Sequence, residues 1–243
     1  MRLAVAIMHA PWATERAAHV KRLARALDGH CEALTVVKDI DRLGVWPTAR
    51  KAWGLAASYR TTHVAVMQDD ALPCANFGSL MTGAIAANPH EVITLHSMSR
   101  RFVDEARERG SAWAWGPDAA YGQAMIMPCE LAMEFLQWSE RHIAPSFKHD
   151  DDRLGLWARC TGRGVYVTCP NLIDHVEPTR SLLGHSDRRR VARWFSDGSP
   201  IDWHRGLRDP VRATATLDLR HVLGASRTRP APSPDPSKPR WNR

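Results

Sequence analysis

The sequence predicts a single α/β domain in which helices flank a mixed, Rossmann-like central sheet. Two observations carry this prediction. From residue 2 to about residue 95, short apolar runs alternate with stretches of helical periodicity, which is the pattern of βαβ units. The 243 residues are 44% hydrophobic and 24% charged, the composition of an ordinary globular domain large enough to bury its own core.

The first half of the chain is expected to alternate between strands and helices. Strands are expected at residues 3–8, 33–37, 63–67 and 92–95, which are short apolar runs. Helices are expected at residues 14–27, with Thr14 as the N-cap, at residues 48–58, and at residues 77–87, ending before Pro89.

The second half alternates less regularly. A charged stretch at 100–109 and a turn at 113–117 precede a strand at 122–127 and a helix at 129–141. A helix through Leu156 and Trp157, a strand at 164–168 and a loop at 170–185 follow. The domain is expected to extend to residue 225. Residues 226–243 contain five prolines and five basic residues against one acidic residue, which predicts a basic disordered tail.

Composition limits the class of protein. No apolar run approaches the ~20 residues that cross a bilayer, and the N-terminal run is interpreted as a strand rather than a secretory signal. The five cysteines form no Cys-x-x-Cys pair, which favours reduced thiols and a cytoplasmic location. The net charge of +7, with 28 arginines and five lysines, fits an anionic substrate or partner, although a GC-rich genome also enriches arginine.

Polar residues at the expected strand ends are the first candidates for a site, because ligands of such sheets bind beyond the carboxyl ends of the strands. They are His9, Asp39, Gln68, Asp69 and Asp70. Adjacent carboxylates such as Asp69 and Asp70 can hold Mg²⁺ or Mn²⁺ and leave coordination positions open for a diphosphate. An acidic turn after the strand is the alternative interpretation of this pair.

Two later segments could complete such a site. Asp174 and His175 follow an expected strand, so His175 could supply a metal ligand from a distant part of the chain. Asp150, Asp151 and Asp152 offer a general base, or equally a run of acids favoured by a helix N-terminus. Aromatic side chains at Trp113, Trp115, Tyr121 and Trp157 could stack on a sugar or nucleobase, or could belong to the core.

The order of these segments resembles a known family. The segments are Gln68-Asp69-Asp70-Ala71-Leu72-Pro73, Tyr121-Gly122-Gln123-Ala124-Met125-Ile126-Met127-Pro128, His149-Asp150-Asp151-Asp152-Arg153-Leu154-Gly155-Leu156-Trp157, Pro170-Asn171-Leu172-Ile173-Asp174-His175 and Ser181-Leu182-Leu183-Gly184-His185. Over roughly residues 2–186 the chain resembles GT-A-fold glycosyltransferases that use nucleotide-sugar donors. It is most similar to small bacterial and phage enzymes akin to the lipooligosaccharide glycosyltransferases.

The resemblance implies a donor-binding half at about residues 1–95 and an acceptor half at about 96–225. Gln68, Asp69 and Asp70 correspond to the family's DxD-like motif, with Asp70 and His175 as ligands of Mn²⁺ or Mg²⁺. The family's first position is more often acidic, so Gln68 leaves the recognition of the ribose and the dependence on metal open.

The remaining roles implied by the resemblance are assigned by position. Asp151 is expected to be the catalytic base, with Asp150 as its competitor. Donor contacts are expected from Gln68, Asp69, Asp39, Arg16, Arg50 and Lys51, and acceptor contacts from Trp113, Trp115 and Tyr121.

The expected donor is a nucleotide sugar, with a UDP-sugar as the first choice. The basic cluster at 188–194 and the basic tail favour a polyanionic acceptor, such as a hydroxymethylated base in phage-type DNA, modified in the host cytoplasm. A saccharide such as lipopolysaccharide is the rival acceptor. A metal-dependent phosphohydrolase or nucleotidyltransferase, and a non-catalytic nucleic-acid-binding domain, are the alternatives from other classes.

Overall fold

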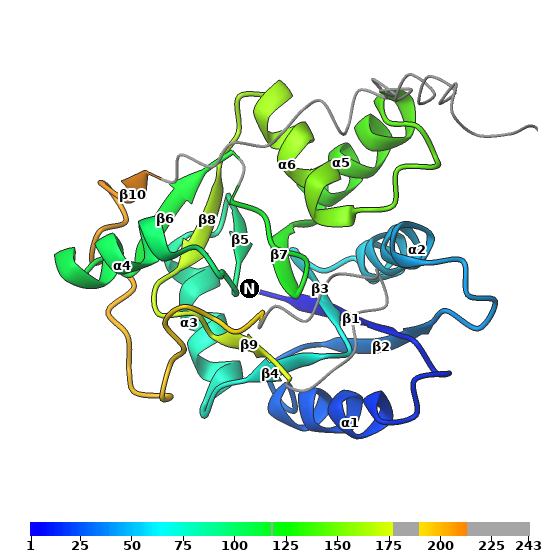
Figure 1. The fold of residues 1–243 in the computed structure, drawn as a ribbon, viewed down its shortest axis with the longest axis horizontal. Helices are drawn as coiled ribbons and strands as arrows, with labels where there is room; N and C mark the ends of the chain where they lie inside the picture. The colour runs from blue at the N-terminus through cyan, green and yellow to red at the C-terminus, as the bar shows by residue number, and fades with distance from the viewer. Residues whose placement is uncertain (118, 177–189, 213–243) are drawn as a thin grey trace, which may run out of the picture.

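The computed structural model describes residues 1–117, 119–176 and 190–212. Within them, the chain forms an α/β fold around an eight-stranded mixed sheet, as the sequence predicts (Figure 1). The strands of this sheet are β1 (Leu3–His9), β2 (Ala33–Lys38), β3 (His63–Gln68), β5 (Val92–Thr94), β6 (Trp113–Gly116), β7 (Ala124–Pro128), β8 (Val165–Thr168) and β10 (Val211–Arg212).

The order of the strands across the sheet is β10-β6-β8-β5-β7-β3-β1-β2. β1 pairs in parallel with both β2 and β3, and β5 pairs in parallel with β8. β7 runs antiparallel between β3 and β5, which makes the sheet mixed. The carboxyl ends of β1, β2 and β3 therefore meet at one edge of the sheet, where ligands of α/β proteins bind.

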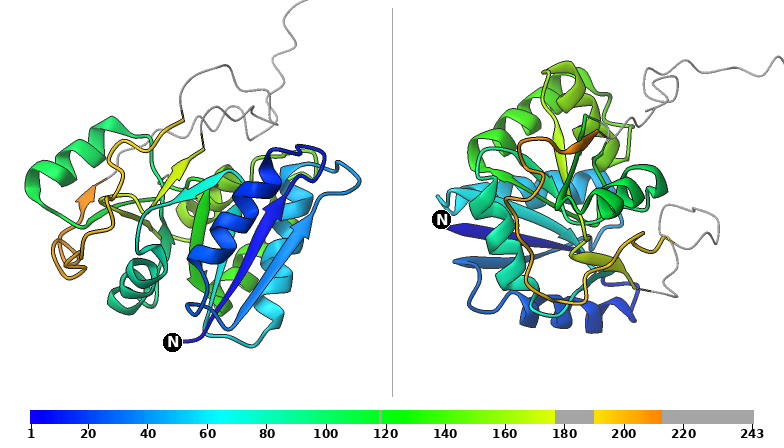
Figure 2. Two further views of the ribbon diagram at one scale, coloured as in Figure 1. Left: turned by 90° about the horizontal axis from the view of Figure 1, so that it is seen from below. Right: turned by 90° about the vertical axis from the view of Figure 1, so that its left-hand side faces the viewer.

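Helices cover both faces of the sheet. They are α1 (Arg16–Ala26), α2 (Val45–Ser58), α3 (Phe77–Ala87), α4 (Arg100–Arg109), α5 (Cys129–His142) and α6 (Asp150–Cys160). The core with α2, α4, α5 and α6 contains one set of alternating strand residues, such as Ala6 and Val66. The core with α1 and α3 contains the other set, such as Ile7 and Met67. Alternation along each strand thus sends apolar side chains to two separate cores, one beneath each of the two layers of helices that Figure 2 shows on either side of the sheet.

A small second sheet links distant parts of the chain. β4 (Ala71–Pro73) pairs antiparallel with β9 (Ile173–His175), and Ala71 lies opposite His175. The backbone N–H of Val176 also donates to the carbonyl oxygen of Asp70, at 2.9 Å. This pairing holds His175 next to the end of β3, although about a hundred residues separate the two segments in the sequence.

Several local predictions are corrected by the structure. The turn expected at 113–117 is largely strand β6, because Trp113 is fully buried and residues 113–116 pair antiparallel with β8. The helix expected from Thr14 begins at Arg16, with Glu15 at the N-cap position and no side-chain capping bond. The helix expected from Thr48 begins earlier, at Val45. The loop expected at 170–185 contains β9; its residues 177–185, and the tail at 226–243, lie outside the described residues.

Across the part of the chain that the structure describes, no helix has both the length and the apolar character needed to cross a bilayer.

Candidate active site

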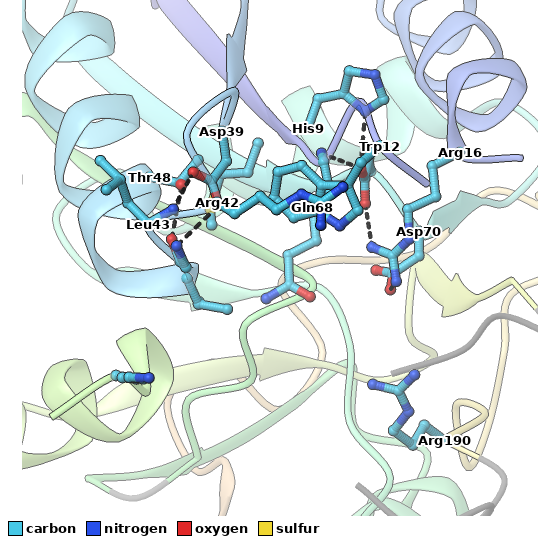
Figure 3. Close-up of a pocket in the computed structure, with 16 residues that line it drawn as sticks. His9, Trp12, Arg16, Asp39, Arg42, Leu43, Thr48, Gln68, Asp70 and Arg190 are labelled. Atoms are coloured by element: carbon cyan, nitrogen blue, oxygen red, sulfur yellow. Dashed lines mark hydrogen bonds and ion pairs between the residues drawn. The ribbon is translucent and has the colours of Figure 1, made fainter. Parts of the chain in front are cut away.

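A pocket of about 420 Å³ opens at the carboxyl ends of β1, β2 and β3 (Figure 3). This volume is within the range of small-molecule sites. Side chains of four successive segments line it: Trp12 after β1, Arg16 on α1, Asp39 after β2, and the end of β3 at Gln68 and its neighbours. The sequence places Asp39 and Gln68 to Asp70 at this edge, and the structure brings them together in one pocket.

Asp69 connects the end of β1 to α1 inside the pocket. One carboxylate oxygen, Oδ2, accepts the backbone N–H of Ala10 at 2.8 Å and lies 2.9 Å from Nδ1 of His9. The other oxygen, Oδ1, accepts a hydrogen bond from the guanidinium of Arg16. Both oxygens of this buried carboxylate are therefore used to join the end of β1 to α1, and Asp69 orients the pocket rather than presenting a free oxygen to a ligand.

Asp70 lies beside a histidine and an arginine. Its Oδ2 is 3.2 Å from Nε2 of His175 and 3.2 Å from Nη2 of Arg16, and all three side chains are nearly completely buried. Burial alone would raise the pKa of Asp70, but the hydrogen bond to His175 and the charge of Arg16 together hold that pKa below its ordinary value. Asp70 is therefore ionised at neutral pH.

The Asp70 and His175 pair has the properties of a cation site. Nδ1 of His175 lies 3.0 Å from the carbonyl oxygen of Val176, which can only accept, so Nδ1 carries a proton. Nε2 donates to Asp70 Oδ2 when both ring nitrogens are protonated, and in the neutral ring it offers a lone pair that can bind a cation instead. Among the described residues, buried Oδ1 of Asp70 has no hydrogen-bond partner. An ionised carboxylate with an unpartnered oxygen and a correctly oriented imidazole fits a divalent metal ion.

Asp39 organises the wall of the pocket next to β2. Its two carboxylate oxygens accept the backbone N–H groups of Leu43 and Gly44 at 2.7 and 2.9 Å. This bonding fixes the loop that leads into α2, and it uses the carboxylate that was expected to contact the donor. In the same region the guanidinium of Arg42 lies over the ring of Trp12, 5.4 Å from its centroid.

Cations from four segments line the pocket: Arg16, Arg42, Lys148 and Arg190. In Figure 3, Arg190 projects toward Asp70 from the opposite side of the pocket. The carboxylates that line it are Asp39, Asp69 and Asp70. Arg16 is paired with Asp69 and Asp70, so the positive charge that would receive an anionic ligand such as a diphosphate comes from Arg42, Lys148 and Arg190.

Gly122 brings the α6 carboxylates to the pocket. A Cβ atom at this position would lie 2.8 Å from Nε2 of Gln68, 3.3 Å from Oδ1 of Asp150 and 3.7 Å from Oδ2 of Asp151. A side chain there would have to displace the Gln68 amide, so the end of β3 and the start of α6 meet closely around this backbone segment. The sequence names all three polar residues as site candidates, and the structure assembles them.

The two α6 carboxyl groups have different environments. Burial raises the pKa of Asp150 to about 8, and the neighbouring Asp151 charge adds to this effect. One oxygen of Asp150, Oδ2, has no hydrogen-bond partner in the described part of the chain. Burial therefore favours the protonated form of Asp150, whereas Asp151 is only partly buried.

Other residues proposed from the sequence lie elsewhere. Arg50 and Lys51 occupy the exposed face of α2, where Arg50 pairs with Glu140 of α5, and neither lines the pocket. Their assignment to the diphosphate is corrected, because the buried face of α2 is formed by other positions, such as Ala49 and Trp53.

The aromatic residues that were expected to stack on a sugar or nucleobase do not lie together in the structure. Trp113 is fully buried and donates its indole N–H to the carbonyl oxygen of Trp203, so it is a core residue. Trp157 is buried in the core on the other face of the sheet. Trp115 lies under Arg212, 4.4 Å from its guanidinium carbon, and next to Gly164. Of these aromatic residues, Tyr121 is the one near the α6 carboxylates. It is partly buried and packs edge-on against His96. Burial raises the pKa of Tyr121, and the nearby charge of Asp151 raises it further.

A second group of possible metal ligands lies at the start of α6. Ligand atoms of His149, Asp151 and Asp152 are within 4.8 Å of one another, and all three residues are partly exposed. This group is separate from Asp70 and His175. Three acids at a helix N-terminus also have a structural explanation, because they stabilise the helix dipole.

Sequence reasoning missed four residues that shape the pocket: Trp12, Arg42, Lys148 and Arg190. Trp12 and Arg42 follow β1 and β2 by a few residues, so extending the search beyond the strand ends would have found them. Lys148 lies two residues before the acidic run at 150–152. Nothing in the sequence distinguishes Arg190 from the arginines beside it.

Fold and site together define an α/β protein with a cation-lined pocket and a buried acid and histidine pair at the carboxyl edge of a mixed sheet. The sequence matches no protein-family model and no curated protein.

Solved structures similar to this chain include glycosyltransferases. One is a glycosyltransferase involved in the glycosylation of the major capsid of PBCV-1, with 14% identity and a TM-score of 0.49, covering 74% of this chain and 95% of that chain. Residues 1–349 of TarS from S. aureus have 10% identity and a TM-score of 0.43, with 71% and 59% of the two chains covered. The mannosyltransferase PcManGT from Pyrobaculum calidifontis, in complex with GDP-Man and Mn²⁺, has 18% identity and a TM-score of 0.40, with 70% and 57% covered. All three TM-scores are below 0.5, and the functional argument below rests on the site.

Proposed function

We propose that this protein is a metal-dependent glycosyltransferase that transfers a sugar from a nucleotide-sugar donor to an acceptor hydroxyl group. The observation that carries the proposal is the joint placement of two features at one sheet edge. Asp70 and His175 form a candidate metal site, and the adjoining pocket is lined by four cations. A divalent ion and a diphosphate are the two components of a nucleotide-sugar donor site.

Asp70 and His175 would hold Mn²⁺ or Mg²⁺ through the unpartnered Oδ1 of Asp70 and Nε2 of His175. When bound, the ion would stabilise the negative charge of the departing nucleoside diphosphate. Arg16 also supplies positive charge at this point, since it contacts both Asp69 and Asp70.

The protein's own residues would position the donor. Arg42, Lys148 and Arg190 would bind the phosphates, and the ring of Trp12 would offer an aromatic surface for the base. Asp39 would act indirectly, because it holds the loop that carries Arg42 and Leu43. The donor that we expect first is a UDP-sugar.

Asp151 is the proposed catalytic base. A base must be ionised, and the raised pKa of Asp150 keeps that group protonated at neutral pH. Asp151 reaches the same point beside Gly122 and Gln68. Asp150 would then donate a hydrogen bond inside the site, while Asp151 would take the proton of the acceptor hydroxyl.

The acceptor hypotheses are a hydroxymethylated base in DNA and a saccharide. The basic cluster at 188–194 supported DNA, but its described residues do not act as one surface: Arg190 lines the pocket, Arg193 pairs with Asp104, and Trp194 lies under Arg107. The basic residues of this cluster therefore give less support to a DNA acceptor. Both acceptor classes therefore belong in the activity assay.

A thermal-shift panel tests the donor site first. UDP-, GDP-, CMP- and TDP-sugars are compared with and without Mn²⁺ on the wild type, on Asp70→Ala, and on Asp28→Ala, which removes an exposed aspartate outside the pocket. Ligand at a hundred times its Kd stabilises by about 2.7 kcal/mol, a shift of a few degrees. We expect a Mn²⁺-dependent shift with one donor, lost in Asp70→Ala and kept in Asp28→Ala.

Other outcomes favour the other classes. Release of nucleotide without transfer of a sugar to either acceptor class would support a phosphohydrolase or nucleotidyltransferase. Salt-sensitive DNA binding that survives Asp70→Ala, with no shift by any nucleotide sugar, would support a non-catalytic nucleic-acid-binding protein. Either result would refute the glycosyltransferase proposal.

A further inference from the structure

Strand β2 is an exposed edge of the main sheet. Within the described residues it pairs only with β1, and α1 lies on one face and α2 on the other (Figures 1 and 2). Leu34 and Val36 are 38% and 36% exposed on this strand, and Ile40 and Leu43, in the loop that follows, are 72% and 63% exposed. An apolar edge strand is a surface on which another strand can pair, and proteins usually protect such edges.

The side chains of the edge have a regular order on its α1 face. Leu34 and Val36 lie next to Val5 and Ile7 of β1, which belong to the α1 core. The same alternation places Glu32 and Lys38, both exposed, on this face at the two ends of the strand. The face therefore presents an acid, two apolar side chains and a base, in that order.

The direction of the backbone groups follows from β1. The N–H of Asp39 donates to the carbonyl oxygen of His9, and the parallel register places His9 opposite Lys38, so Ala33, Thr35 and Val37 direct their backbone groups toward β1. Alternation then directs the N–H and C=O groups of Leu34, Val36 and Lys38 outward from the sheet.

We propose that β2 pairs antiparallel with β2 of a second copy of this chain, so that the sheet continues across a two-fold axis at Thr35. In this register Thr35 faces Thr35 of the other copy and Ala33 faces Val37, as non-hydrogen-bonded pairs. Between them Leu34 faces Val36, and these outward-facing residues form the hydrogen-bonded pairs. At each end Glu32 faces Lys38, which gives two interchain ion pairs.

The pattern of side chains on β2 is complementary to itself when the strand is reversed, which favours a second copy of this chain as the partner. A two-fold interface presents one surface to itself, so its charges must match when the strand is reversed. The sequence from Glu32 to Lys38 meets this condition with opposite charges at its ends and apolar residues between. A shift of two residues keeps the hydrogen-bond pattern but removes the contacts between Glu32 and Lys38, so the centred register is favoured.

Charge reversal tests the register. Sedimentation velocity measures dimer formation for the wild type, Glu32→Lys, Lys38→Glu and the double variant, with Met133→Lys as a control at an exposed apolar residue on α5. Each single reversal turns two attractive pairs into two repulsive ones, and we expect the dissociation constant to rise about tenfold. The double variant restores opposite charges and should dimerise like the wild type, as should Met133→Lys.

Cysteine cross-linking gives an independent test that keeps the charges. A non-hydrogen-bonded antiparallel pair, such as Thr35 with Thr35 of the other copy, has a Cα separation of about 4.5 Å, which is within the range of a disulfide. Thr35→Cys should therefore form a covalent dimer under mild oxidation. Ala33→Cys should not, because Ala33 faces Val37. The wild type, which has an exposed Cys160, measures background cross-linking.

Three results would overturn the proposal. One is a wild type that stays monomeric up to about 100 μM, the range in which a small interface should associate. Another is a dimer that neither single charge reversal weakens. The last is equal cross-linking of Thr35→Cys and Ala33→Cys. None of these results depends on the proposed enzymatic activity, because no β2 residue lines the pocket.

Discussion

The buried carboxyl group of Asp150 gives the sharpest prediction for stability. Burial first, and the Asp151 charge second, raise its pKa to about 8, against about 3.9 in an unfolded chain. Between these two pKa values the unfolded state has released the proton and the folded state keeps it. The wild type therefore loses stability as pH rises through this window, by about 1.4 kcal/mol per pH unit for this group.

Asp150→Asn removes the titration and keeps the shape of the side chain. The unfolding free energy of the variant minus that of the wild type should rise by about 4 kcal/mol from pH 5 to pH 8 and should level off above that range. Urea unfolding at several pH values in metal-free buffer measures the difference. Asp150→Ala should give the same slope with a constant offset for its cavity.

A flat difference between Asp150→Asn and the wild type would contradict this reasoning. It would mean that Asp150 is ionised in the folded protein at neutral pH. The assignment of Asp151 as the base would then lose its support, because the two carboxylates would be equivalent candidates.

Three further predictions concern Arg16, Gly122, and the pair of glycines Gly164 and Gly54. Arg16→Met leaves buried carboxylates without their cation and should cost about 3–5 kcal/mol in urea unfolding, partly recovered by Mn²⁺; a cost under about 1 kcal/mol would contradict the ion-pair argument. Gly122→Ala places a Cβ 2.8 Å from the Gln68 amide, so transferase activity should fall at least about tenfold at nearly unchanged Tm, and full activity would show that the close approach is unimportant. Gly164→Ala would put a Cβ 1.8 Å from the Trp115 ring and should destabilise by about 1–3 kcal/mol, whereas Gly54→Ala, with no neighbour within 4 Å in the interior of α2, should stabilise by roughly 0.5–1 kcal/mol.

The elements of the fold that were predicted best are those with a strong local pattern. The helix at Phe77–Ala87 was placed correctly at both ends, and the buried strands β1 and β3 were placed within a residue. β6 was missed because two tryptophans followed by glycine and proline resemble a turn. Its strand character comes from pairing with β8, about fifty residues away, which no local pattern reveals.

The site residues that could be predicted are polar residues that directly follow a strand. Asp69 and Asp70 were identified in this way. Their different roles were not, because the hydrogen-bond partners of Asp69 come from the end of β1 and from α1. Arg50 and Lys51 were misplaced because a short helix offers basic residues on every face until its packing is known. The raised pKa of Asp150 depends on burial, which three consecutive acids in a sequence do not indicate.

The β4–β9 pairing also affects when, during folding, the proposed metal site would form. Asp70 and His175 come together only when a strand near residue 72 finds one near residue 174, so the unfolded chain has no preformed ligand pair. Closing so long a loop is among the slower steps of folding a small domain. Metal binding would therefore report the completed native topology and would stabilise it without competition from the unfolded state. A newly synthesised chain would become competent to bind the ion only after β9 has emerged and paired.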